Sequence, residues 1–140
     1  MTRAIPGQGW FLAGTLLTLL AGLAHTAGQF TPEEPELAVA LVAMRTAHLP
    51  MGMSMAPSLF DIFRDLAFTM SITFFALAAL NIVIVRHRDT TAALLRTVTL
   101  VNLVWLAVFI GVCWLYAVPP PLISGVLIWP FYLIALLRNR

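Results

Sequence analysis

The sequence predicts an all-α integral membrane protein built as a bundle of four membrane-spanning helices. Of its 140 residues, 61% are hydrophobic and only 10% are charged, whereas an ordinary soluble domain carries about 25% charged residues. A globule of this size cannot hide so many apolar side chains, because its surface is large for its volume. The apolar residues also gather in four runs close to the roughly 20 residues that a helix needs to cross the hydrocarbon core. Lipid must therefore be part of the solvent.

The four expected spans belong to one domain, residues 1–140. They cover about residues 10–30, 62–85, 95–117 and 122–137. The first run is longer than the apolar core of a secretory signal peptide, so we expect it to be retained. The fourth run is the shortest, and Pro119-Pro120-Pro121 can serve as its entrance. It also contains Pro130, which lacks a backbone donor and favours a kink.

The arginines predict the orientation of the spans. Six of the eight basic residues, all arginines, lie at the termini or around the connection between the second and third spans. The first connection and its flanks hold only Arg45 and Arg64. Because cytoplasmic loops carry an excess of Lys and Arg, we expect both termini in the cytoplasm and the first connection outside. The net charge of +2 is too scattered for nucleic acid, which needs a basic patch on one face.

The first connection is expected to hold a short amphipathic helix. Thr31-Pro32-Glu33-Glu34 has the capping-box pattern, with Pro at the first helical position, and predicts a helix over about residues 32–49. Such a helix is too short to span and would lie across the outer mouth of the bundle as a lid. An irregular methionine-rich turn follows. Ser58-Leu59-Phe60-Asp61 then repeats the capping pattern and opens the second span, which favours capping and local ion pairing as the roles of Asp61 and Arg64.

A pocket beneath the outer helix is the leading functional interpretation. His25 lies about one and a half turns inside the first span, and an ionisable residue at that depth marks a functional site. A few polar groups orient a ligand in a mostly apolar pocket, and the candidates here are His25, Gln29, Asp65, Thr69 and Tyr116. The protein would then be a non-catalytic accessory subunit or a binder of a small apolar or amphipathic ligand. Its partners would be the bilayer and another membrane protein or further copies of itself.

Two other functions remain open. His25 with His48 or Asp65 could ligate haem b or a metal, or transfer protons, in a redox or intramembrane acid/base enzyme. Alternatively His48, Met51, Met53 and Met55 could bind Cu(I), because thioether ligands suit that ion, although methionine also fills gaps in apolar turns. The single Cys113 excludes a disulfide or a CxxC redox pair within the chain.

Asn81 and Asn102 are expected to meet. Each lies five or six residues from the cytoplasmic end of its span, so an antiparallel hairpin would bring the two amides to the same depth. An interhelical hydrogen bond is the favoured role for polar side chains placed in this way.

The order of these features resembles a family of small four-span bacterial inner-membrane proteins. The resemblance rests on Gly22-Leu23-Ala24-His25, the acidic connection, Ser58-Leu59-Phe60-Asp61, Phe68-Thr69-Met70-Ser71 and Ala79-Leu80-Asn81, and it covers most of the chain. It implies an architecture and a bacterial inner-membrane location but no reaction. After Asp61, where such proteins usually have Gly, this chain has Arg64 and Asp65.

Overall fold

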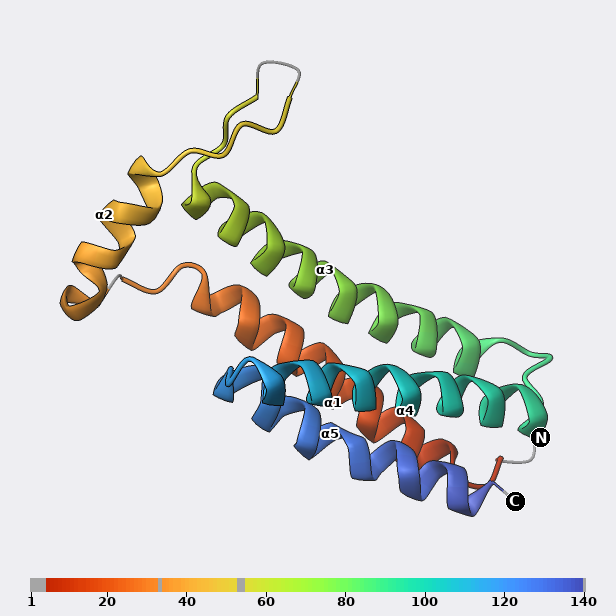
Figure 1. Ribbon diagram of the computed structural model, residues 1–140. Coiled ribbons are helices and arrows are strands. Elements are labelled where there is room, and N and C mark those ends of the chain that lie inside the picture. Colours follow the sequence, from red (N-terminus) through yellow and green to blue (C-terminus); the bar gives the residue numbers. More distant parts are fainter. Residues whose placement is uncertain (1–4, 33, 53–54, 140) are drawn as a thin grey trace. The chain divides into compact units, whose positions relative to one another are not determined.

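The computed structural model describes residues 5–32, 34–52 and 55–139, and the described residues fold into helices with no strand (Figure 1). Glu33 of the expected capping box and Met53 of the expected copper ligands lie outside these ranges. The all-α fold class is confirmed. The elements in order are α1 (Gln8–Gly28), the 3-10 helix η1 (Pro35–Leu37), α2 (Ala38–Thr46), α3 (Leu59–Arg86), α4 (Ala92–Leu115) and α5 (Pro119–Arg138).

The helices α1, α3, α4 and α5 are each long and apolar enough to cross a membrane. The shortest, α5, has 20 residues and is therefore about 30 Å long at 1.5 Å per residue, which matches the hydrocarbon core. It is longer than the sequence predicted because Pro119 to Pro121 form its first turn, where missing N–H groups cost nothing. The helix also continues through Pro130. The chain is thus a multi-pass membrane protein.

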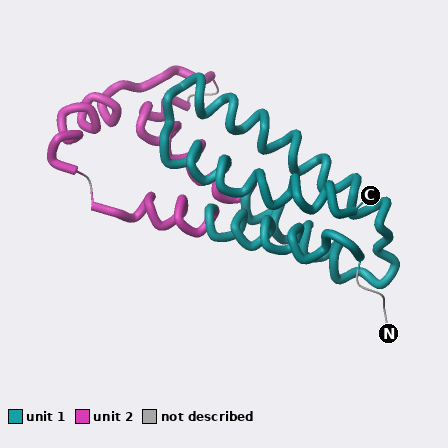
Figure 2. The backbone as a smooth tube through the Cα atoms, turned by 90° about the horizontal axis from the view of Figure 1, so that it is seen from below, with its two compact units in different colours: residues 1–21, 74–140 teal, residues 22–73 magenta. Residues whose placement is uncertain are grey.

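The chain divides into two compact units (Figure 2). The first comprises Met1–Ala21 and Phe74–Arg140, so it holds the start of α1, the end of α3, and all of α4 and α5. The second comprises Gly22–Thr73 and holds the end of α1, η1, α2 and the first half of α3. Both α1 and α3 therefore contribute to both units.

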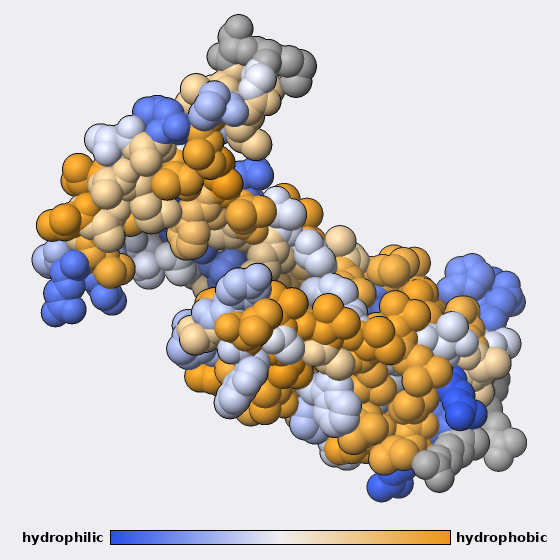
Figure 3. Space-filling view, in the orientation of Figure 1, coloured by the Kyte–Doolittle hydropathy of each residue, from blue (hydrophilic) through white to orange (hydrophobic). Residues whose placement is uncertain are grey.

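The first unit has the core of a four-helix bundle. Phe11 of α1 packs edge-on against Tyr132 of α5, with ring centroids 5.4 Å apart. Phe74 of α3 packs edge-on against Trp105 of α4 at 5.4 Å. Both Phe11 and Tyr132 belong to one buried apolar cluster with residues of α4. Many other large apolar side chains of these helices are exposed (Figure 3), which suits helices whose outer faces contact lipid.

The short helix of the first connection differs from its expected bounds and start. The hydroxyl of Thr31 donates to the carbonyl oxygen of Gly28 at 2.8 Å, so Thr31 closes the end of α1 and does not cap the next helix. Helical structure begins at Pro35, and the preceding Glu34 makes no side-chain cap. The capping box predicted at Thr31 is wrong because Pro35, and not Pro32, provides the fixed backbone angle at the helix start. The helix α2 then ends at Thr46, so the predicted range 32–49 was too long.

The second capping box is confirmed. The backbone N–H of Asp61 donates to the Ser58 hydroxyl oxygen at 3.1 Å, and the backbone N–H of Ser58 donates to the Asp61 carboxylate at 3.1 Å. The Ser58 hydroxyl donates to the same carboxylate oxygen at 2.7 Å. This reciprocal pair satisfies two N–H groups that have no partner inside the helix. It fixes the start of α3 at Leu59, about one turn earlier than the expected span.

Candidate functional site

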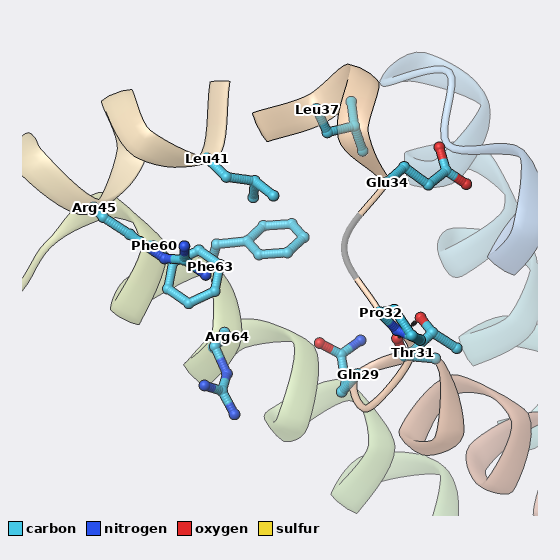
Figure 4. Close-up of a pocket in the computed structure, with 11 residues that line it drawn as sticks. Gln29, Thr31, Pro32, Glu34, Leu37, Leu41, Arg45, Phe60, Phe63 and Arg64 are labelled. Carbon is cyan, nitrogen blue, oxygen red and sulfur yellow. Dashed lines mark hydrogen bonds between the residues drawn. The ribbon is translucent and has the colours of Figure 1, made fainter. Parts of the chain in front are cut away.

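The second unit contains an open pocket of about 340 Å³ (Figure 4). Leu37 and Leu41 form one apolar side, from η1 and α2, while Phe60 and Phe63 of α3 form the other. The residues that follow α1, including Gln29, complete the wall. The volume lies in the range of about 300 to 1,000 Å³ that is typical of small-molecule sites. The connection between α1 and α3 thus supplies an open pocket that is lined by both apolar and polar side chains.

The polar rim of the pocket carries both signs of charge. Arg45 and Arg64 line it on the α2 and α3 sides, and Glu34 lines it at the start of η1. The guanidinium carbon of Arg45 lies 4.6 Å from the centroid of the Phe60 ring. Gln29 adds a neutral amide, which donates to the carbonyl oxygen of His25 at 3.5 Å. A ligand with an apolar body and a polar head would find partners for both parts here.

Arg64 is held between two aromatic rings of its own helix. Its guanidinium carbon lies 5.8 Å from the ring centroids of both Phe60 and Phe68. Residues four apart share one face of a helix, so Phe60, Arg64 and Phe68 form a continuous stripe on α3. A cation within about 6 Å of an aromatic face is attracted to it. The two rings therefore orient the Arg64 side chain before any ligand arrives.

His25 has a backbone partner within the second unit. Its Nε2 lies 3.2 Å from the carbonyl oxygen of Ala67 on α3. Because a carbonyl only accepts, Nε2 carries the proton, and Nδ1 is left as the nitrogen that could bind a metal or a proton. His25 thus ties the end of α1 to α3. Sequence reasoning did not name this partner because a backbone carbonyl leaves no mark in the sequence.

The other ligand candidates from the sequence do not gather at one place. Gln29 lines the pocket. Asp65 and Thr69 are exposed on α3 and are not among the lining residues. Tyr116 caps the end of α4 in the other unit, where 71% of its surface is exposed. The structure therefore groups Gln29 with Arg45, Arg64 and the two phenylalanines.

The methionine-rich turn is a short, irregular hairpin, with no regular strand among its described residues. Isolated antiparallel bridges join His48 to Ser58 and Gly52 to Met55. The Nδ1–H of His48 donates to the carbonyl oxygen of Ala56 at 2.8 Å. Within the described residues, no group of three or more His, Cys, Asp or Glu could hold a metal ion.

A second polar cluster lies inside the first unit. The amide of Asn81 donates to Asn102 Oδ1 at 2.9 Å, and the amide of Asn102 donates back to Asn81 Oδ1 at 3.1 Å. The remaining N–H of Asn102 donates to the carbonyl oxygen of Val98 at 2.8 Å. The interhelical hydrogen bond favoured by the sequence is present, and it joins α3 to α4.

Tyr132 extends this cluster to the other two helices. Its hydroxyl accepts from the Asn81 amide at 3.0 Å and lies 3.3 Å from the hydroxyl oxygens of Thr15 and Thr18. Both threonine hydroxyls donate to carbonyls one turn back on α1, so their oxygens face Tyr132 as acceptors. All five side chains are buried, and no buried polar side-chain atom in the described residues lacks a partner. The cluster links α1, α3, α4 and α5, and we assign it to bundle stability.

Sequence reasoning missed two features of these sites. Phe60, Arg64 and Phe68 are spaced four residues apart, which is visible in the sequence. The capping pattern already explained the polar residues at the start of α3, so this spacing was not interpreted. Thr15 and Thr18 carry no signal of their own, because a threonine hydroxyl in a span can bond to a carbonyl of its own helix, and nothing in the sequence pairs Tyr132 with them.

Comparisons with protein-family models, with curated protein sequences and with solved structures find no match for this chain.

Proposed function

We propose that this protein binds a small amphipathic molecule in the outer pocket of its second unit and has no catalytic role of its own. The observation that carries the proposal is the pocket itself, which combines Leu37, Leu41, Phe60 and Phe63 with a charged rim. Binding sites for small molecules likewise combine apolar walls with polar groups that fix the orientation of the ligand.

We also propose that the protein lies in a bacterial inner membrane with both termini in the cytoplasm. Arg86, Arg88 and Arg96 surround the connection between α3 and α4. The amide of Asn139 donates to the carbonyl oxygen of Ala92 at 2.8 Å, so the end of α5, with Arg138, lies beside the start of α4. Four arginines thus mark one end of the first unit, as the positive-inside rule requires of the cytoplasmic side.

Fusion reporters test this orientation. Green fluorescent protein fused after residue 140 is expected to fluoresce, because it folds in the cytoplasm. Alkaline phosphatase inserted in the hairpin after Pro50 is expected to be active, because it needs the oxidising outer compartment. The reverse pattern, an active phosphatase at the C-terminus and an inactive one after Pro50, would refute the proposed orientation.

Retention of a ligand through purification tests the binding function. Protein extracted in a mild sugar-based detergent is expected to carry about one amphipathic molecule per chain, detected by native mass spectrometry and identified after solvent extraction. The Leu41→Trp variant should lose it, because the larger ring fills the pocket from the α2 side.

The matched control is Val39→Trp on the same helix. Val39 does not line the pocket and has 84% of its surface exposed, so this variant should retain the molecule as the natural protein does. Natural protein without any bound amphiphile, or Leu41→Trp with undiminished retention, would contradict the proposal.

A further inference from the structure

We propose that the pocket selects a membrane phospholipid through its phosphate group, and that Arg64 is the residue that recognises it. This inference rests on the proposed function, because it assumes that the pocket takes an amphiphile. It adds that the head group contains a phosphate and that Arg64 binds this phosphate.

Two aromatic rings restrain the charged group of Arg64. The rings of Phe60 and Phe68 flank the guanidinium group at equal distances of 5.8 Å. A guanidinium group offers a planar fork of N–H donors that matches phosphate oxygens in pairs. Because the rings already restrict the side chain, less conformational entropy is lost when a phosphate binds.

Among the described residues, Arg64 has no ion pair with its acidic neighbours on α3, although the Asp61 carboxylate lies close enough to interact with its charge. The Asp61 carboxylate, one turn before Arg64, accepts two hydrogen bonds from Ser58 at the start of the helix. Asp65 follows Arg64 directly in sequence, and adjacent residues on a helix do not face each other. The guanidinium group of Arg64 is therefore able to serve a phosphate on the rim of the pocket.

The depth of Arg64 also fits a phospholipid. With 28 residues, α3 is about 42 Å long, which exceeds the roughly 30 Å hydrocarbon core. The uncharged run of α3 begins at Leu66 and continues to Val85, which places Arg64 at the boundary between hydrocarbon and head groups. Phe68 is one turn deeper and Phe60 one turn further out. A lipid phosphate occupies this same layer of the membrane.

Two lipids with identical tails test the inference. Delipidated protein in dodecyl maltoside micelles, which contain no phosphate, is titrated with dioctanoyl phosphatidic acid or with dioctanoylglycerol, and bound lipid is counted by native mass spectrometry. The natural protein should bind the phosphatidic acid at least about tenfold more tightly, since charge-assisted hydrogen bonds contribute that much. Arg64→Gln should abolish the preference, and Arg64→Lys should retain part of it.

A control variant and a competition with inorganic phosphate accompany these titrations. Arg88→Gln removes an exposed arginine in the other unit and should leave the preference intact. Inorganic phosphate at millimolar concentration should not displace the lipid, and displacement would show a site for free phosphate instead. Equal binding of both lipids, unchanged by Arg64→Gln, would overturn the phosphate inference while leaving the proposed function standing. Binding of neither lipid, together with no amphiphile after purification, would overturn both.

Discussion

Replacing Tyr132 with alanine is expected to lower the free energy of unfolding of the bundle by about 3 to 5 kcal/mol, the usual cost of deleting a buried aromatic ring. The Tyr132 ring is fully buried, with 0% of its surface exposed, and it packs edge-on against Phe11. A Cβ atom at Gly14 would lie only 3.2 Å from the ring, so α1 and α5 are in close contact here. Removing the ring leaves a cavity and breaks the hydrogen bonds that join the helices.

Tyr132→Phe separates the contribution of ring packing from that of the hydroxyl hydrogen bonds. It keeps the ring and removes the hydroxyl, which leaves one Asn81 N–H without its partner. The expected loss is about 1 to 2 kcal/mol, the cost of an unsatisfied buried donor. Unfolding in detergent micelles by increasing sodium dodecyl sulfate, followed by tryptophan fluorescence, measures both variants.

Tyr116→Ala provides the matched control for these measurements. Tyr116 has 71% of its surface exposed, so its truncation is expected to change the unfolding free energy by less than about 0.5 kcal/mol. Equal losses from Tyr132→Ala and Tyr116→Ala would contradict the central position that the structure gives to Tyr132.

Gly125→Val is expected to destabilise the bundle by about 3 kcal/mol, at the upper end of the usual cost of overpacking. Gly125 is buried on α5, and a Cβ atom there would lie 2.8 Å from Cγ1 of Ile110 and 3.3 Å from a ring carbon of Phe109. Small residues at such positions let helix backbones approach closely in a membrane. A valine would force α4 and α5 apart.

Gly111→Val on α4 is the matched substitution. A Cβ atom at Gly111 would meet nothing within 4 Å, so only helix propensity changes, by less than about 0.5 kcal/mol. The same detergent unfolding assay compares the two variants. If Gly125→Val were as stable as Gly111→Val, the close contact between α4 and α5 would be excluded.

The sequence alone determined the fold class and most of the helix plan. The lengths of the apolar runs predicted four spans, because the thickness of the bilayer fixes how many residues a helix needs. Ser58 and Asp61 predicted the start of α3, since a capping box is a local pattern. Asn81 and Asn102 were paired from their depths alone. The first capping box failed because Pro35 competed with Pro32 as the start of the helix.

Only the tertiary structure decided which faces meet and where a ligand could enter. The spans are apolar nearly all round, so no periodic pattern shows which side of a helix turns inward. Tyr132 as the centre of the polar cluster, and the Ala67 carbonyl as the partner of His25, followed only from the packing. The pocket joins Gln29, Leu41 and Arg64 from three separate segments. The distances between such segments depend on how the chain packs, and their spacing along the sequence does not determine them.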